Sequence, residues 1–490
     1  MVHAFLIAVL SIIPAPESSG PNGILAIPAT SPIVEVREAG MPKEAYRMTV
    51  SPTGAVTIVS ADAAGAFYAR QTLRQLTDFR GYACATVEDR PRYSWRGLHF
   101  DDCRHFFGKE TLKKTLDVMS QYKFNVLHWH LTDYQGWRLD VPGYPDLVRY
   151  GAVRRASPKH GARMMRNPNG TSSMELDGQA YGPFYYTEAD IREVVAYAAE
   201  RHITVVPEIE LPGHVFAALA AYPEFACNPE NLSARSPRLI WGVEQDVLCV
   251  GNDRAIRFME DVLAYVCRVF PSEVVHIGGD ECPRTRWEKC PRCQKRIRDE
   301  RLGDTKNLQA WATRHFVEFL AARGKRTIGW DEYLLGAGIP ETAMGMSWRL
   351  GETKSTGHGW LSPAELAAKG HDVVMTPMSA CYLDYRQELE DDPFEYIGGV
   401  VTLAQCHAAD FCAGVPEELR KHILGGQGNN WSEYTWNRYD LEWKMWPRAC
   451  ALAEVLWCGE RKPAFADFLR RMKVHRKRLI AQGVNCAPVE

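Results

Sequence analysis

The chain has 490 residues, of which 46% are hydrophobic and 24% charged, and its formal net charge is -2. This length allows two or three domains, or one large barrel with insertions, and the composition is that of an ordinary globular protein. The chain lacks the basic excess that nucleic acid requires, and no apolar run approaches the ~20 residues of a membrane span. We therefore expect a small organic substrate, no nucleic-acid partner and no membrane span.

Residues 1–22 form an apolar N-terminal segment that contains the run "AFLIAVLSII". The run has the length of a signal peptide, but no Lys or Arg precedes it and no A-x-A site follows before "PAPE". Two interpretations remain open: a signal peptide of an exported protein, periplasmic or secreted, or a first strand of a cytoplasmic one. The sequence does not indicate the oligomeric state.

Residues 23–90 are expected to form a small α/β domain. In "EAYRMTVSPTGAVTIVS" a Pro-Thr-Gly turn separates two runs rich in β-forming residues, which predicts a pair of strands. The following "DAAGAFYARQTLRQL" places Phe67, Leu73 and Leu76 within reach of one helix face, with Asp62 as the cap. The proline-rich string "EDRPRYSW" marks the end of this domain.

Residues 91–460 alternate short apolar strands with longer helical stretches, which indicates parallel βαβ units. Eight strands are expected, at "RGLHFD", "NVLHWHL", "TVVPEIEL", "VVHIGGD", "RTIGWD", "AMGMSW", "DVVMTP" and "ILGGQGNNW". Eight such units predict a (β/α)8 TIM barrel. We expect an irregular one, because the segment after the sixth strand is short and that after the seventh lacks one long helix. A helix within 461–490 should pack on the barrel.

Polar and aromatic residues follow nearly every predicted strand, where the active site of such a barrel gathers. Each has a structural alternative: Arg104 could simply pair with Asp101, and His214 could cap a helix. Their coincidence favours a pocket for a pyranose, whose faces stack on aromatic rings while its hydroxyls need polar partners. The candidates are Arg104, Asp133, His214, Asp280, Glu281, Trp330, Trp348, Tyr382, Asp384, Trp431 and Glu433.

Cysteine spacing gives one hint of a metal site. "CPRC" contributes Cys290 and Cys293, with Cys282 nearby, but a zinc site would need a second matching pair and none lies close in sequence. We therefore expect no metal and no cofactor, and loop thiols, or a local disulfide if the protein is exported. Cys227 and Cys249 bracket a polar loop and could also be paired, although sequence cannot establish the connectivity.

Several motifs in this order resemble glycoside hydrolase family 20, the β-N-acetylhexosaminidases. The central one is "HIGGDE", preceded by "RGLHFDDCRHF", "HWHLTDYQGWR" and "PEIELPGH" and followed by "GWDE", "YLDY" and "GGQGNNWSEY". The resemblance covers nearly the whole chain. It implies a retaining enzyme without a protein nucleophile, in which the 2-acetamido oxygen of the substrate attacks the anomeric carbon and forms an oxazoline-type intermediate.

The resemblance also implies roles for individual residues. Glu281 would be the general acid and then the base, a role that requires a raised pKa. Asp280 would orient the acetamido N–H, and Tyr382 would donate to the acetamido oxygen. The walls of the acetamido pocket would be Trp330, Trp348 and Trp431. The sugar hydroxyls would be bound by Arg104, Asp384 and Glu433, with His214 and Asp133 supporting the acid.

These roles imply exo cleavage of glycans that carry a terminal β-linked GlcNAc or GalNAc. Two alternatives remain: a disaccharide-releasing enzyme such as a lacto-N-biosidase, and a catalytically inactive sugar-binding protein. Two residues depart from the family pattern, Tyr134 where the family often has Asp and Glu210 where it often has Asp. The loop of about 151–185 is the least predictable part, and it is expected to shape the aglycone side.

Overall fold

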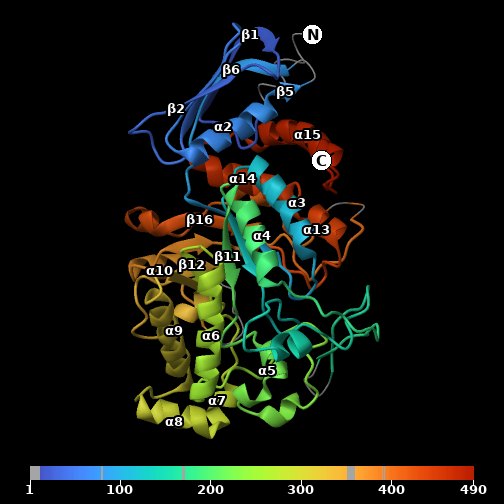
Figure 1. Cartoon of the computed structure of the whole chain (residues 1–490), viewed down its shortest axis with the longest axis vertical. Helices are drawn as coiled ribbons and strands as arrows, with labels where there is room; N and C mark the ends of the chain where they lie inside the picture. The colour runs from blue at the N-terminus through green and yellow to red at the C-terminus, as the bar shows by residue number, and fades with distance from the viewer. Residues whose placement is uncertain are drawn as a thin grey trace.

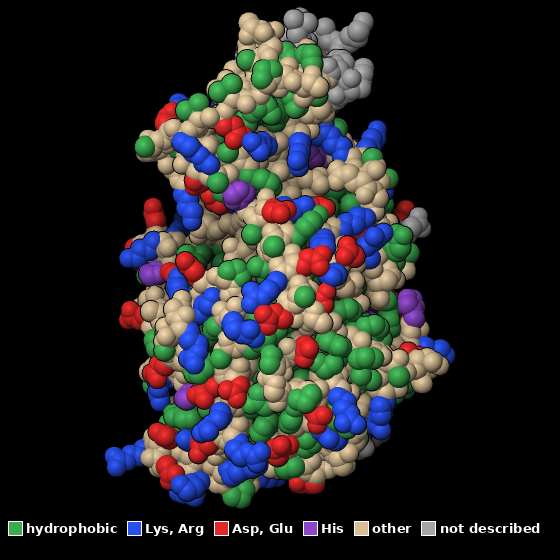
Figure 2. Space-filling view, viewed as in Figure 1, with side chains coloured by type: hydrophobic (Ala, Val, Ile, Leu, Met, Phe, Trp, Pro, Cys, Tyr) green, Lys and Arg blue, Asp and Glu red, His purple; other side chains and the backbone are tan. Residues whose placement is uncertain are grey.

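The computed structural model describes residues 11–78, 81–167, 172–349, 359–388, 390 and 392–489. A sheet domain built from the N-terminal part of the chain lies at one end of the molecule, and a barrel with its surrounding helices fills the rest (Figure 1). On the face drawn in Figure 2, basic and acidic side chains are interspersed over both parts. Among the described residues, no helix has the length and apolar character needed to cross a membrane.

In the part of the chain that the structure describes, the N-terminal domain is a six-stranded sheet with one covering helix. Its strands are β1 (Ser18–Ile27), β2 (Ile33–Arg37), β3 (Tyr46–Val50), β4 (Val56–Ser60), β5 (Thr77–Asp78) and β6 (Gly81–Asp89), in the order β1-β6-β3-β4-β2 with β5 beside β6. β3 and β4 pair antiparallel across the predicted turn. Helix α2 (Ala63–Gln75) begins where Asp62 Oδ1 accepts the Gly65 N–H at 2.8 Å, so the predicted helix and its cap are confirmed.

The first described residues of the N-terminal segment, 11–14, are buried, and residues 17–19 are exposed. Ile12 and Ile13 are buried, and the backbone N–H of Ile13 donates to Gln75 Oε1 at 2.8 Å. β1 crosses the boundary expected at residue 22. Residues 1–10 lie outside the described part of the chain.

The eight predicted barrel strands are all present, and together they confirm the fold class. They close a barrel in which every neighbouring pair is parallel. In chain order the strands are β7 (Trp95–Asp101), β8 (Val126–His130), β11 (Thr204–Glu208), β12 (Val274–His276), β13 (Arg326–Trp330), β14 (Met344–Ser347), β15 (Val373–Met375) and β16 (Ile423–Gly428). β7 and β8 are buried along their whole length, as expected for strands with helices outside and a packed interior.

The helices around the barrel are uneven. Long helices follow the first four strands: α3 (Gly108–Gln121), α4 (Glu188–Ala199), α6 (Asp253–Val269) and α9 (Thr305–Ala321). After β14 and β15 only the short α10 (Pro363–Ala368), α11 (Met378–Cys381) and α12 (Leu403–Ala408) are seen among the described residues, so the predicted irregularity is confirmed. α14 (Arg448–Cys458) comes later in the chain than β16, and α15 (Phe465–Ala481) lies at the level of α2, below β1 and β6 and above α14 (Figure 1).

Buried ion pairs join the sheet domain to the barrel. Arg96 on β7 donates from both terminal nitrogens to the Glu44 carboxylate, at 3.0 and 3.2 Å, and Lys123 pairs with Asp89 at 2.7 Å. Because isolated charges are costly to bury, each of these groups requires its partner. The two parts of the chain therefore form one structural unit.

Candidate active site

The candidate site lies beyond the C-terminal ends of the barrel strands, and the loop after β12 supplies its two adjacent acids. Gly278 and Gly279 have φ of 62° and 93°, and Glu281 has φ of 40°. A Cβ on Gly278 would lie 1.8 Å from Glu210 Oε2, and one on Gly279 would lie 2.4 Å from Tyr333 Cβ. The two glycines therefore allow the chain to turn sharply between packed neighbours and to deliver Asp280 and Glu281 together.

Asp280 and Glu281 share one neighbour, His214. Its Nε2 lies 3.6 Å from Asp280 Oδ2 and 3.7 Å from Glu281 Oε2. The Asp280 side chain is 13% exposed and that of Glu281 25%. Burial raises the pKa of Asp280 to about 7; His214 opposes the rise, and the carboxylates of Glu332 and Glu281 add to it. The loop thus presents one deeper and one more accessible acid.

Asp133 links His214 to Arg104. Its Oδ1 lies 3.2 Å from His214 Nδ1, and its Oδ2 lies 2.8 Å from Arg104 Nη2. Burial alone would raise the pKa of Asp133, but the guanidinium of Arg104 and the imidazole of His214 hold it well below its usual range. Tyr134, one of the two departures from the family pattern, stacks on His214 with ring centroids 4.3 Å apart, so it contributes packing to the same support.

Glu210, the other departure, lies behind the acids. Its backbone N–H donates to Thr132 Oγ1 at 2.9 Å, and its carboxyl group is buried against Gly278. Burial, with the carboxylates of Asp280 and Glu208, raises the pKa of Glu210 well above its usual range. A neutral carboxyl here limits the negative charge beside Asp280.

Arg104, Asp384 and Glu433 form the polar side of the site. Arg104 Nη2 lies 3.6 Å from Glu433 Oε1. Asp384 Oδ1 and Glu433 Oε2 are buried and have no hydrogen-bond partner among the described residues, and the same is true of Asp280 Oδ1. Three buried carboxylate oxygens in one site are therefore available to accept hydrogen bonds from the donor groups of a ligand.

The four predicted aromatic residues lie in contact. The rings of Trp330 and Trp431 are 5.6 Å apart, those of Trp348 and Tyr382 stack at 6.3 Å and 24°, and the side chains of Tyr382 and Trp431 also interact. Arg104 lies over the Trp431 ring at 5.0 Å, which joins this wall to the polar side. The structure therefore brings all eleven sequence-predicted residues into one connected set of contacts.

Two supporting acids were not among the sequence candidates. Glu332 accepts the Trp348 indole N–H at 3.1 Å. Glu208 accepts that of Trp330 at 2.8 Å and also contacts the buried His128 and His276 at 3.0 and 2.9 Å. Both residues stand inside motifs that carry the family resemblance, "GWDE" and "PEIEL". Glu332 follows the candidate Trp330 by two residues, which was the available signal, whereas Glu208 is six residues from His214, the nearest candidate, and had no such signal.

A cavity of about 1030 Å³ opens beside these residues. Arg104, His214, Glu281 and Glu433 line it on the barrel side. The opposite walls come from loops, and they include the exposed apolar side chains of Met164, Val243 and Ile397. A volume of this size accommodates more than a single small ligand group, with Glu281 at the boundary between the polar site and the open part.

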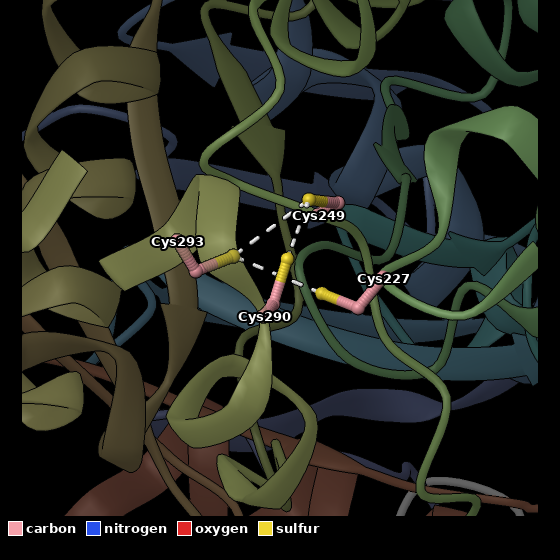
Figure 3. Close-up of side chains that lie close together, drawn as sticks. All are labelled: Cys227, Cys249, Cys290 and Cys293. Atoms are coloured by element: carbon pink, nitrogen blue, oxygen red, sulfur yellow. Dashed lines mark hydrogen bonds between the residues drawn. The ribbon is translucent and has the colours of Figure 1, made fainter. Parts of the chain in front are cut away.

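The cysteines are arranged differently from the sequence expectation. Cys290 and Cys293 do have a second pair, Cys227 and Cys249, which lies far from them in sequence. The four sulfur atoms all lie within 4.8 Å of one another (Figure 3). Cys282 is buried but does not belong to this group. The proposed Cys227–Cys249 disulfide is not formed, because both are free thiols. The expectation of no metal relied on the absence of a second pair close in sequence, and the structure brings together a pair that is distant in sequence.

A closed parallel barrel whose strand ends carry paired acids, an aromatic wall and unpartnered polar oxygens has the architecture of a barrel glycoside hydrolase. Residues 93–460 match the model of the glycosyl hydrolase family 20 catalytic domain, and residues 9–90 match that of the family's domain 2. The chain belongs to glycosyl hydrolase family 20.

Named relatives agree with this assignment. The chain is 40% identical over 456 residues to a beta-hexosaminidase of Porphyromonas gingivalis, covering 90% of this chain and 54% of that protein. It is 35% identical over 442 residues to a beta-hexosaminidase of Akkermansia muciniphila, covering 89% and 83%. The chain thus spans little more than half the length of the first relative.

Solved structures resemble the chain over almost its full length. The crystal structure of a beta-N-acetylhexosaminidase matches with a TM-score of 0.84 and 32% identity, covering 98% of this chain and 97% of that one. The GH20 exo beta-N-acetylglucosaminidase from Vibrio harveyi, in complex with N-acetylglucosamine, matches with a TM-score of 0.82 and 28% identity, covering 98% and 78%.

Proposed function

We propose that the chain is a retaining exo-β-N-acetylhexosaminidase that removes terminal β-linked GlcNAc or GalNAc from glycans. The observation that carries the proposal is the arrangement of Asp280 and Glu281 on one sharply turned loop, one deep and one at the cavity wall. Two acids that flank a glycosidic bond normally stand on opposite sides of it, about 5 to 9 Å apart. Adjacent acids suit a reaction in which the substrate provides its own nucleophile.

The two acids have different roles in the proposed reaction. Glu281 donates a proton to the leaving oxygen as the acetamido oxygen bonds to the anomeric carbon and the glycosidic bond breaks. Asp280 accepts a hydrogen bond from the acetamido N–H and stabilises the positive charge that develops on that group, while Tyr382 donates to the acetamido oxygen. Glu281 then takes a proton from water, which attacks the anomeric carbon and opens the cyclic intermediate.

The polar side of the site supports exo specificity. Arg104, Asp384 and Glu433 supply charged groups for the sugar hydroxyls, and the unpartnered oxygens of Asp384 and Glu433 are buried. A sugar bound by these groups has its non-reducing end enclosed by the protein. A second sugar unit attached at that end would therefore collide with the protein. This arrangement favours release of a single sugar over release of a disaccharide, and the structurally similar Vibrio harveyi protein is likewise an exo enzyme.

The experiment that tests the function is hydrolysis of p-nitrophenyl β-GlcNAc and β-GalNAc by the wild type, Glu281→Gln and Asp280→Asn. Loss of a general acid and base typically costs about 10²- to 10⁴-fold in rate, so Glu281→Gln should fall by that range. Asp280→Asn removes the charge that stabilises the acetamido group and should cost about 10²- to 10³-fold. Glu175→Gln, which changes an exposed carboxylate, is the matched control. A thiazoline mimic of the intermediate should inhibit strongly.

Two outcomes would contradict the proposal. If the wild type bound GlcNAc but released nothing from either substrate, the chain would be an inactive sugar-binding protein. If it hydrolysed both substrates but ignored the thiazoline, the substrate-assisted mechanism would be wrong while the activity stood.

We further propose that the loop of residues 151–185 helps to set linkage preference. Met164 from this loop is 43% exposed and lines the cavity beyond Glu281, on the side to which the leaving group departs. A Met164→Ala variant should keep its activity on p-nitrophenyl β-GlcNAc but change the order of rates over a panel of natural linkages. An unchanged order would remove this loop from the aglycone site.

A further inference from the structure

Four cysteine sulfurs form a compact group outside the candidate active site. They come from Cys227 and Cys249, which flank a loop after β11, and from Cys290 and Cys293 at the start of α8 (Pro291–Asp299) (Figure 3). The group lies at the end of the molecule opposite the N-terminal domain, where α7 (Thr285–Lys289) and α8 are drawn in Figure 1. No residue of the proposed reaction belongs to it.

The spacing of the sulfurs corresponds to a metal coordination tetrahedron. The Sγ–Sγ distance is 3.7 Å for Cys227–Cys293, for Cys249–Cys290 and for Cys249–Cys293. A tetrahedron with metal–sulfur bonds of about 2.3 Å has edges of about 3.8 Å. Two disulfides would instead place the sulfurs in bonded pairs about 2 Å apart, whereas Cys249 stands at the same distance from two different partners.

From this geometry we propose that Cys227, Cys249, Cys290 and Cys293 bind one structural zinc ion. Four thiolates are a soft ligand set that selects zinc over calcium, magnesium or manganese. All four positions of the tetrahedron are supplied by the protein, so no position is left for substrate or water, and the ion is structural. Cys290 and Cys293 have the C-x-x-C spacing of zinc sites, and they lie at a helix N-terminus, which stabilises thiolates.

The surroundings hold the two ligand pairs together. The Cys249 N–H donates to Phe225 O at 2.8 Å, next to the bridge that pairs Ala226 with Leu248. A Cβ on Gly251 would lie 2.3 Å from the backbone of Arg292 and Cys293, so the two segments meet backbone to backbone.

Arg292 supplies a positive charge at this point. Its Nη2 donates to Ala226 O at 2.8 Å, and its guanidinium interacts with Cys290 and Cys249. Because four thiolates and one Zn²⁺ carry a net negative charge, a neighbouring guanidinium favours the loaded site.

The site joins two loops that border the candidate active site. The loop between Cys227 and Cys249 carries Trp241 and Val243 of the cavity wall. The chain that leads to Cys290 begins at Glu281 and includes Trp287, whose indole donates to Leu248 O at 2.9 Å. A zinc ion here would hold the outer wall of the cavity at a fixed place relative to the acid.

The test is the metal content of the full chain, purified under reducing conditions without chelators and measured by inductively coupled plasma mass spectrometry. We expect about one zinc ion per chain, released when a mercurial reagent modifies the thiols. Replacement by Co²⁺ should give the intense visible bands of a tetrahedral tetrathiolate site. These readouts do not depend on hydrolysis, so they stand or fall separately from the proposed function.

Variants locate the ion. Cys290→Ser/Cys293→Ser should lose zinc almost completely, and Cys267→Ser, which removes a thiol outside the group, should retain it. Should the double variant prove insoluble, the zinc content and cobalt spectrum of the wild type decide the question. Three results would overturn the proposal: a metal-free wild type, disulfides among these four cysteines in a non-reducing peptide map, or iron as the bound metal.

Discussion

At the scale of single residues, the clearest predictions concern the buried carboxylate oxygens of the site that have no hydrogen-bond partner among the described residues. Asp384 Oδ1 and Glu433 Oε2 have no partner among the described residues. Burial, followed by the carboxylate of Glu433, raises the pKa of Asp384 to about 7. Donor groups from a bound sugar would favour the ionised carboxylates of both residues, because hydrogen bonds to a charged acceptor stabilise its charged form.

Asp384→Asn and Glu433→Gln should each lower kcat/KM for p-nitrophenyl β-GlcNAc by about thirtyfold, because a hydrogen bond to a charged group contributes about 2 kcal/mol. Thermal unfolding should change little for Asp384→Asn, whose Oδ1 makes no internal bond in the described part of the chain, and more for Glu433→Gln, which also weakens the contact of Glu433 Oε1 with Arg104 Nη2. Michaelis–Menten kinetics beside the Glu175→Gln control check this. An unchanged kcat/KM would place the sugar hydroxyls elsewhere.

The pH profile should report the ionisation of Asp280. Its carboxylate must be charged to stabilise the acetamido group, and its pKa is raised by burial to about 7, so kcat/KM should fall as the pH drops below that value. The titratable groups that surround Asp280 are His214, Arg349, Glu332, Glu281, Glu208 and the raised-pKa Glu210.

Two substitutions should move the acidic limb of the profile, the fall of kcat/KM at low pH, in opposite directions. Glu332→Gln removes a negative neighbour, which lowers the pKa of Asp280 and moves the limb to lower pH while an acceptor for the Trp348 indole remains. His214→Asn removes a positive neighbour and moves the limb to higher pH. Shifts in the same direction would assign the limb to another group.

At the scale of elements, the candidate active site lies at the ends of the barrel strands. The two glycines of the loop after β12 determine the positions of Asp280 and Glu281. Gly278→Ala would combine the left-handed conformation with a clash against the Glu210 carboxyl group. The conformation alone costs about 1 to 2 kcal/mol, and the displacement of Asp280 and Glu281 should abolish most of the activity.

Gly143→Ala is the matched control for this change. Gly143 has φ of 87° but open space around its Cβ position, so only the same conformational cost of about 1 to 2 kcal/mol applies. Urea denaturation and the p-nitrophenyl assay compare the two variants. Equal losses of stability, with activity retained in both, would show that the contact with Glu210 is unimportant.

Sequence predicted the elements better than the contacts between them. All eight barrel strands were predictable because each is a short apolar run between helical stretches. The candidate residues lie at or shortly after the ends of those strands, which is why the sequence grouped them, and their roles stay a prediction. The cysteine group was not predictable, since Cys249 and Cys290 are 41 residues apart and meet only through the packing of two loops. Glu208 was missed for the same reason, because its partners come from three other strands.

At the scale of the whole molecule, the sheet domain and the barrel should unfold together. Arg96 and Glu44 are a buried pair across their junction, and the Arg96 guanidinium also lies 5.0 Å from the ring of Trp457. Breaking a buried pair by removing one partner typically costs about 3 to 5 kcal/mol. Glu44→Ala should therefore lower the free energy of unfolding by an amount in that range.

Denaturation followed by fluorescence and by circular dichroism checks this prediction. The wild type should show one coincident transition by both probes. Lys159→Ala, which removes an exposed pair with Glu175, should leave the transition unchanged. Two separate transitions in the wild type would show that the sheet domain is an independent unit.

The bridge between Ala226 and Leu248 has a further consequence for how this protein could be altered. The two ends of the intervening loop are held side by side by this bridge. Each doubling of the length of such a loop costs only about 0.6 kcal/mol in closure entropy. Residues within it could be exchanged or added while the strands and the acids stay in place. Trp241 is buried and the neighbouring Ile240 carbonyl accepts the Gln135 side-chain N–H at 2.9 Å, so changes aimed at new aglycone preferences belong at the exposed Val243 rather than at Trp241.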